Sequence, residues 1–169
     1  MPILATMGIK ALYFADLNTD ATKMPTNGFK AVDVYQDTCS FVDKDPTITT
    51  HKSETSSKKI IQKTKEGSEL KFSIMDPSME ILAALEGGKY TPAASGTKAT
   101  YVEPDTAQDI ELAFKVLPQA GNALNISCAS VSVKKNTTYS AKGITLLEVT
   151  VSPTYSVEYN EDVTAPTTA

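Results

Sequence analysis

The strongest constraint on the fold of this chain is an alternation of apolar and polar residues with a period of two. Between residues 67 and 75, Leu70, Phe72 and Ile74 share one face of an extended segment, and polar residues occupy the other. The same alternation occurs in residues 108–117, 122–134 and 143–159. One apolar face per strand is typical of antiparallel sheets that bury one side. The sequence therefore predicts a mainly β fold, with antiparallel strands closed into a sandwich or small barrel.

The alternating segments also predict the hydrophobic core. A chain of 169 residues with 41% hydrophobic residues is long enough to bury a core as one domain. We expect residues 1–159 to form that domain and residues 160–169 to be a mobile polar tail. The side chains expected to be buried are Leu70, Phe72, Ile74, Leu82, Leu85, Ile110, Leu112, Phe114, Leu147, Val149 and Val151.

One segment has the signals of a helix. Asp76 is a favourable N-cap, Pro77 suits the first helical position, and Gly87-Gly88 supplies a C-terminal stop. The apolar residues between them recur at helical spacing, at Met79, Ile81, Leu82 and Leu85. These signals predict one flanking helix over about residues 77–86.

Two further segments have less regular patterns. Residues 90–106 are rich in Pro, Gly, Ser and Thr, which predicts a loop with a short strand near Tyr101. In residues 122–134 the alternation slips by one position after Cys128, which predicts a β-bulge near Ala129 and Ser130.

Residues 47–65 differ in composition from the rest of the chain, and we call this segment the arm. It is rich in Thr, Ser and Lys, and its only large aliphatic residues are Ile48, Ile60 and Ile61. Thr and Ile favour strands, but three isoleucines cannot fill a core, so we predict a long exposed β-hairpin. The alternative is a disordered polar loop. The candidate subunit-interface residues in the arm are Ile48, Lys52, Lys58, Lys59, Ile60, Ile61 and Lys63.

Composition argues against several classes of function. The net charge is −4 and the chain contains neither arginine nor tryptophan, which disfavours base-specific DNA binding, phosphate capture and sugar stacking. The chain contains no nucleotide-binding glycine motif and no nucleophile motif. His51 is the only histidine and lies in the polar arm. We therefore expect no catalytic residue, no cofactor and no enzymatic activity.

Metal binding, disulfide formation and membrane insertion are disfavoured on similar grounds. Residues 16–20 begin like a calcium loop, but Ala21 and Asn27 stand where Gly and Glu are required, so we expect an ordinary turn. Cys39 and Cys128 lie in apolar runs and are interpreted as two buried thiols, with a disulfide as the alternative. We expect no metal site, and the N-terminal residues predict neither a signal peptide nor a membrane span.

One constellation resembles a known family. The polar arm precedes residues 66–74, EGSELKFSI, and residues 76–88, DPSMEILAALEGG, and further strands follow. This order of arm, strand, helix and Gly-Gly resembles the tail-tube (major tail) proteins of long-tailed bacteriophages. These are similar in fold to the hemolysin-coregulated tube protein of type VI secretion. The resemblance covers most of residues 8–159.

The resemblance carries its own expectations. It implies stacked rings, usually hexameric, that form a hollow tube through which DNA passes without sequence recognition. It implies no enzyme activity and no cofactor. The partners implied are other copies of the chain and tail proteins such as sheath, terminator or tape measure. The location implied is a virion tail made in the bacterial cytoplasm, or a phage-derived injection device. The alternatives are an immunoglobulin-like or adhesin-like binding domain and an enzyme of another type.

Overall fold

The fold is mainly β, as the sequence predicts. The computed structural model describes residues 7–168. Its main sheet is antiparallel and has the strand order β2-β1-β9-β10-β11-β6-β3, with β12 also paired to β10. The strands of this sheet are β1 (Ala11–Ala15), β2 (Lys30–Val32), β3 (Ser40–Asp43), β6 (Ser68–Met75), β9 (Ile110–Leu117), β10 (Ala123–Thr137), β11 (Thr145–Pro153) and β12 (Glu158–Asn160).

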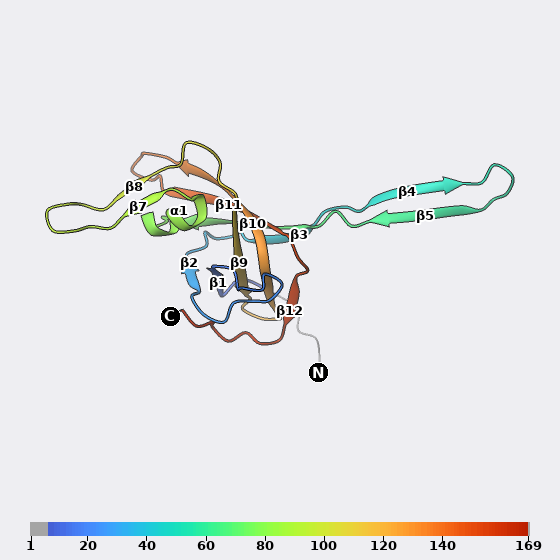
Figure 1. The fold of residues 1–169 in the computed structure, drawn as a ribbon, viewed down its shortest axis with the longest axis horizontal. Helices are drawn as coiled ribbons and strands as arrows, with labels where there is room; N and C mark the ends of the chain where they lie inside the picture. The colour runs from blue at the N-terminus through green and yellow to red at the C-terminus, as the bar shows by residue number, and fades with distance from the viewer. Residues whose placement is uncertain (1–6, 169) are drawn as a thin grey trace.

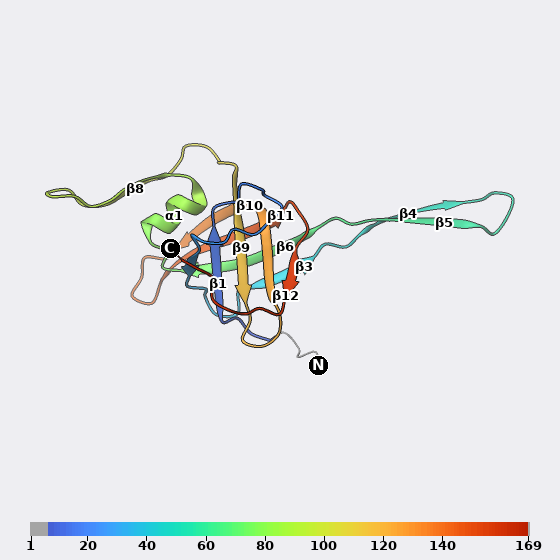
Figure 2. The ribbon, with the colours of Figure 1, turned by 60° about the horizontal axis from the view of Figure 1, so that its bottom comes forward.

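Strand β10 bends the sheet into two layers. Its first part pairs with β9 and β12, and its second part pairs with β11. In Figure 2, β1 and β9 therefore cross β6 and β3 at a steep angle, which gives a β-sandwich-like architecture. The register between β9 and β10 shifts between Ile126 and Ala129. The bulge thus precedes the predicted position, because residues 123–129 are all buried and the slip shows in the sequence only where the strand becomes exposed.

The core lies between the two layers. Phe72 of β6 meets Phe114 of β9 edge to face, with ring centroids 6.2 Å apart. Of the side chains predicted to be buried, Leu82 and Ile110 are only partly buried, and the others are buried. Both exceptions lie at the margin of the core, where α1 and the start of β9 meet solvent. The predicted strand phases are therefore correct for the central residues of β6, β9 and β11.

The chain after β2 links the two layers on one side. The Tyr35 amide donates to the Ser73 carbonyl at 2.8 Å, and the Met75 amide donates to the Asp33 carbonyl at 2.8 Å. Val34 and Ile74 form the bridge between them. These bonds satisfy the outer edge of β6 beyond the point where β3 ends.

The helix is shorter than predicted at its N-terminus. Helix α1 (Met79–Glu86) is capped by Ser78, whose hydroxyl accepts from the Ile81 amide at 3.3 Å. Asp76 is not the cap, because its φ of 45° places it in a left-handed turn after β6. The C-terminal prediction is confirmed, since Gly87 has a φ of 88° and its amide bonds to the Ala83 carbonyl.

The segment predicted as a loop is partly a hairpin. β7 (Lys89–Thr91) and β8 (Thr100–Val102) pair with each other, and the connection between them projects beyond α1 (Figure 1). Gly88 allows this arrangement, because a Cβ at that position would collide with the Val102 carbonyl oxygen and the Tyr101 side chain. The strand expected near Tyr101 is confirmed, and its partner β7 was not predicted.

The C-terminal residues return along the body. The Phe29 amide donates to the Thr167 carbonyl at 3.2 Å, and Asp162 accepts from the Thr164 amide at 2.9 Å. The mobility predicted for residues 160–169 stays a prediction. Across residues 7–168, no helix is long and apolar enough to cross a bilayer, and α1 has only eight residues.

Candidate assembly interface

The arm is a β-hairpin that leaves the body (Figure 1). Strands β4 (Thr47–Lys52) and β5 (Lys59–Thr64) pair with each other and form a sheet of their own. Every residue from 47 to 64 is exposed. The hairpin prediction is confirmed. The backbone pairing of β4 with β5 is the arm's internal support, because no strand of the main sheet joins it.

Polar contacts fix the base of the arm to β6. The Lys44 amide donates to the Gly67 carbonyl at 2.8 Å, and the Thr47 hydroxyl donates to Glu66 at 2.5 Å. The Lys44 ammonium lies 3.1 Å from a Glu69 carboxylate oxygen. This contact, together with Lys71, lowers the pKa of Glu69 below its usual value. The direction in which the arm leaves the body is therefore set by β6 and its flanking turns.

The register of the hairpin divides the arm's side chains into two faces. Residues directly opposite each other in an antiparallel pair share a face, and alternate residues along each strand do likewise. Ile48 pairs with Lys63, Thr50 with Ile61, and Lys52 with Lys59. We call this set the lysine face. It brings together five of the seven predicted interface residues, namely Ile48, Lys52, Lys59, Ile61 and Lys63.

The remaining two predicted residues lie elsewhere on the arm. Ile60 pairs with His51 on the opposite face, among threonines and Gln62. Lys58 lies in the tip before β5, where its carbonyl accepts from the Ser53 amide at 3.0 Å. A surface built on the lysine face therefore excludes Ile60 and leaves Lys58 at its end.

The arm concentrates positive charge. Its five lysines and one glutamate give it a net charge of +4, and the other 150 residues, with 11 lysines and 19 acidic residues, carry −8. None of the five lysines forms an ion pair with any residue between 7 and 168. Lys52 and Lys59 are directly opposite each other on one face, an arrangement that disfavours the hairpin. An acidic partner would remove that repulsion.

The arm also exposes apolar surface. Ile48 is 57% exposed, Ile60 is 56% exposed and Ile61 is 59% exposed. Nothing in the described part of the body covers them. Ile48 and Ile61 lie on the lysine face, so apolar and positively charged groups are presented together. That mixture is typical of an interface with an apolar centre and a charged rim.

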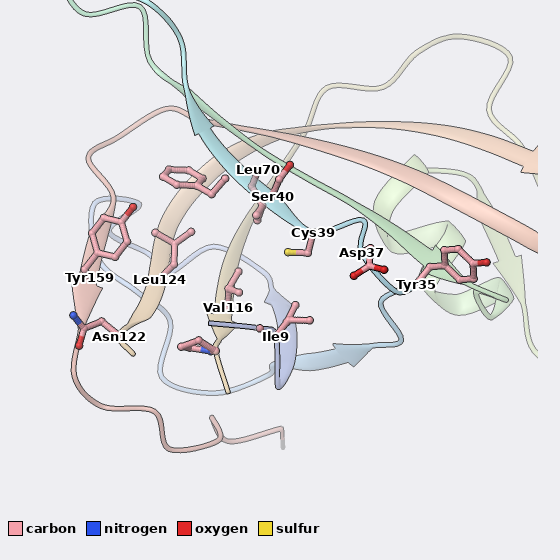
Figure 3. Close-up of a pocket in the computed structure, with 13 residues that line it drawn as sticks. Ile9, Tyr35, Asp37, Cys39, Ser40, Leu70, Val116, Asn122, Leu124 and Tyr159 are labelled. Carbon is pink, nitrogen blue, oxygen red and sulfur yellow. The ribbon is translucent and has the colours of Figure 1, made fainter. Parts of the chain in front are cut away.

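A second feature is a half-open hollow of about 550 Å³ at one end of the sandwich (Figure 3). Residues from β3, β9, β10 and β12 line it, including Phe41, Val116, Leu124 and Tyr159. Asp37 is the only charged side chain among them. Cys39 lies in this wall, and burial raises the pKa of its thiol to about 11. Cys39 is therefore a protonated thiol near neutral pH, and a weak nucleophile.

The other groups considered in the sequence have ordinary surroundings within the described part of the chain. The two cysteines are unpaired, with Cys128 buried and Cys39 partly buried. Asp20 accepts from the Thr22 amide at 3.1 Å, as in an ordinary turn. Among residues 7–168, no three His, Cys, Asp or Glu side chains converge to hold a metal ion.

Sequence reasoning did not find one polar cluster beside α1. Tyr101 donates to Glu86 at 2.7 Å, and Lys135 contacts Glu86 at 3.1 Å, contacts Glu103, and lies 5.8 Å from the centre of the Tyr101 ring. The pKa of Tyr101 is raised to about 12. Desolvation of the side chain is the largest cause, and the neighbouring Glu86 carboxylate is the next. These residues come from α1, β8, β10 and the chain after β8, so no local pattern could have predicted the cluster. It anchors the β7–β8 hairpin to the body.

Comparison with known proteins leaves the family open. No protein-family model matches the sequence, and a search of curated proteins gives no match either. The functional proposal therefore rests on the structure of the arm and of the body from which the arm projects.

Proposed function

We propose that this chain is a self-assembling structural subunit of a phage tail tube or of a related phage-derived injection tube. In this proposal the β-sandwich-like body forms the wall of a ring, and the arm joins one copy to the next. The ring is hexameric by resemblance to the tail-tube proteins. The order of arm, β6, α1 and Gly87-Gly88 in the fold is the order on which that resemblance rests.

The observation that carries the proposal is the exposure of the arm. Three isoleucines are more than half exposed on a hairpin whose strands pair only with each other. A solitary two-stranded hairpin has marginal stability in water. Burial of those isoleucines against another copy would supply the missing stabilisation, at about 25 cal/mol for each Å² of apolar surface removed from water.

The proposal also specifies partners and location. Copies of the chain are the main partner, and sheath, terminator or tape-measure proteins meet the ends or outer surface of the tube. DNA passes through the lumen without sequence recognition, which suits a chain that contains no arginine. The assembled protein belongs to a virion tail after synthesis in the bacterial cytoplasm.

Electron microscopy of the concentrated full-length chain tests the proposal, with sedimentation velocity to measure the mass of what forms. We expect rings or tubes from the parent. A variant in which residues 47–64 are replaced by a short Gly-Asn turn should remain a folded monomer. A parent chain that stays monomeric at every concentration overturns the proposal and favours the immunoglobulin-like or adhesin-like alternative. An arm-deleted variant that still forms tubes overturns the role of the arm.

A further inference from the structure

The lysine face needs a negatively charged acceptor, and one segment of this chain matches it in charge. Residues 103–111 contain Glu103, Asp105, Asp109 and Glu111 and no lysine, which gives this stretch a net charge of −4. We call it the acidic segment. The arm carries the opposite net charge, +4. Complementary charge of this kind fixes which surfaces meet and in what orientation.

Most of the acidic segment is free to take a partner. Lys135 engages Glu103, which ties the start of the segment to β10. Asp105, Asp109 and Glu111 are exposed and form no ion pair with any residue from 7 to 168. Three carboxylates on this segment and three lysines on the lysine face thus lack partners of opposite charge among residues 7–168.

The acidic segment also offers apolar surface for the isoleucines. Val102, directly before it, is 62% exposed. A hollow of about 230 Å³ lies between the segment and the body, and Leu85, Val131 and Val133 are among the residues that line it. The wall of this hollow is mostly polar, because Leu85 and Val131 are buried, and Asp105 of the acidic segment lies in it. An incoming isoleucine would therefore meet apolar surface mainly at Val102.

The two surfaces lie on opposite sides of the molecule. Figures 1 and 2 show the arm projecting from one side of the body, and α1 with β8 on the other. The acidic segment begins at the end of β8 and borders the hollow beside Leu85 and Glu86 of α1. The arm of one copy therefore points away from its own acidic segment, and a second copy must provide the contact.

We propose that the lysine face of the arm docks on the acidic segment of a second copy of this chain. This inference rests on the proposed self-assembly and names the surface that receives the arm. Because the two surfaces differ and face opposite ways, the contact is heterologous. Each copy offers one arm and one acceptor, so copies add head to tail until a ring closes or a filament grows.

Charge reversal tests the pairing. The arm variant is Lys52→Glu with Lys59→Glu, and the acceptor variant is Asp105→Lys with Asp109→Lys. Each alone should raise the concentration needed for assembly by at least about tenfold, because like charges then face each other. In a 1:1 mixture, the reversed arm of one variant faces the reversed acidic segment of the other, and the native arm faces the native acidic segment. Both contacts then pair opposite charges, so the two variants should assemble again in alternation.

The combined variant, with all four substitutions in one chain, should assemble again because its charges are exchanged. The matched controls are Lys98→Glu with Lys142→Glu, and Glu158→Lys with Glu161→Lys, which change the same net charge at exposed positions elsewhere. Thermal melting of every variant confirms that it is folded, and sedimentation velocity measures assembly.

The outcomes separate this inference from the proposed function. If the arm variant fails to assemble and the acceptor variant assembles like the parent, the acceptor lies elsewhere and only this inference is overturned. If the control variant Glu158→Lys with Glu161→Lys loses assembly as much as the acceptor variant does, this inference is overturned as well. A parent chain that never assembles overturns both. Restored assembly of the 1:1 mixture, together with restored assembly of the combined variant, establishes the pairing.

Discussion

The body and the arm are both built from β-strands, but they differ in how far they bury their apolar side chains. In the body, Phe72 and Phe114 are almost completely buried between layers that cover each other. In the arm, Ile48 and Ile61 share a face with lysines and remain more than half exposed. The body therefore meets the requirements of folding within one chain. The arm pairs its own backbone but leaves its isoleucines exposed, and the proposed assembly would cover them.

The two hairpins of the molecule make the same contrast on a smaller scale. The β7–β8 hairpin is attached to the body through Tyr101, Glu86 and Lys135. Among the residues that the structure describes, the arm has no equivalent attachment beyond its base at Lys44 and Glu66. Attachment couples a hairpin to global unfolding, whereas a free hairpin opens and closes independently.

The largest expected difference between body and arm comes from deleting an apolar side chain in each. Phe114→Ala removes a fully buried ring that contacts Phe72 and should destabilise the protein by about 3–5 kcal/mol. Ile61→Ala removes a half-exposed side chain and should change the free energy of unfolding of the monomer by less than about 0.5 kcal/mol. Urea unfolding at a concentration below assembly measures both. Equal losses would mean that the arm belongs to the folded core.

A smaller effect is expected from caps and turns. Ser78→Ala removes the hydroxyl that accepts from the Ile81 amide at 3.3 Å and should cost about 1 kcal/mol. Ser53→Ala in the tip of the arm removes a similar bond, from the Thr55 amide at 3.2 Å. Thermal melting should show a lower melting temperature for Ser78→Ala and an unchanged melting temperature for Ser53→Ala. A shift of similar size in both variants would couple the arm tip to the body.

Alkaline pH should weaken the attached hairpin. The pKa of Tyr101 is raised to about 12 in the folded protein, against about 10 in the unfolded chain. Its contribution to stability is therefore complete below pH 10 and is lost as the pH rises through 12. Urea midpoints measured across this window should fall more for the parent than for Tyr101→Phe. Identical pH profiles would show that the raised pKa of Tyr101 does not contribute.

The smallest change in monomer stability is expected from removing the whole arm. Replacement of residues 47–64 by a short turn deletes no buried side chain, since all of them are exposed. The melting temperature of the monomer should therefore stay within about 2 °C of the parent. Circular dichroism measures the transition. An unfolded product would instead show that β4 and β5 support the body.

The sequence predicted the elements whose signals are local. The alternation at Leu70, Phe72 and Ile74 predicted the buried face of β6, and the Gly87 stop predicted the end of α1. The start of α1 was predicted two residues too early, because Asp76 and Ser78 are both good caps and only the left-handed turn at Asp76 decides between them. The β7 strand was not predicted, because Lys89 to Thr91 has no alternation of its own and is ordered by its pairing with β8.

For the candidate interface too, the sequence predicted one part and the structure decided the other. Composition alone identified the arm and its lysines and isoleucines, because a segment with few apolar residues cannot form a core. It did not show which of them share a face. That depends on the pairing of Lys52 with Lys59 and of Thr50 with Ile61, which is a property of two strands together.

By itself, the sequence determined that this chain is mainly β, that one short helix follows β6, and that residues 47–65 are separate from the core. These properties follow from periodicity and composition, which act over a few neighbouring residues. The tertiary structure decided where β10 bends, how Tyr101, Glu86 and Lys135 meet, and that the arm and the acidic segment lie on opposite sides of the body. Those arrangements join residues far apart in the chain, and only the packing of the layers brings them together or holds them apart.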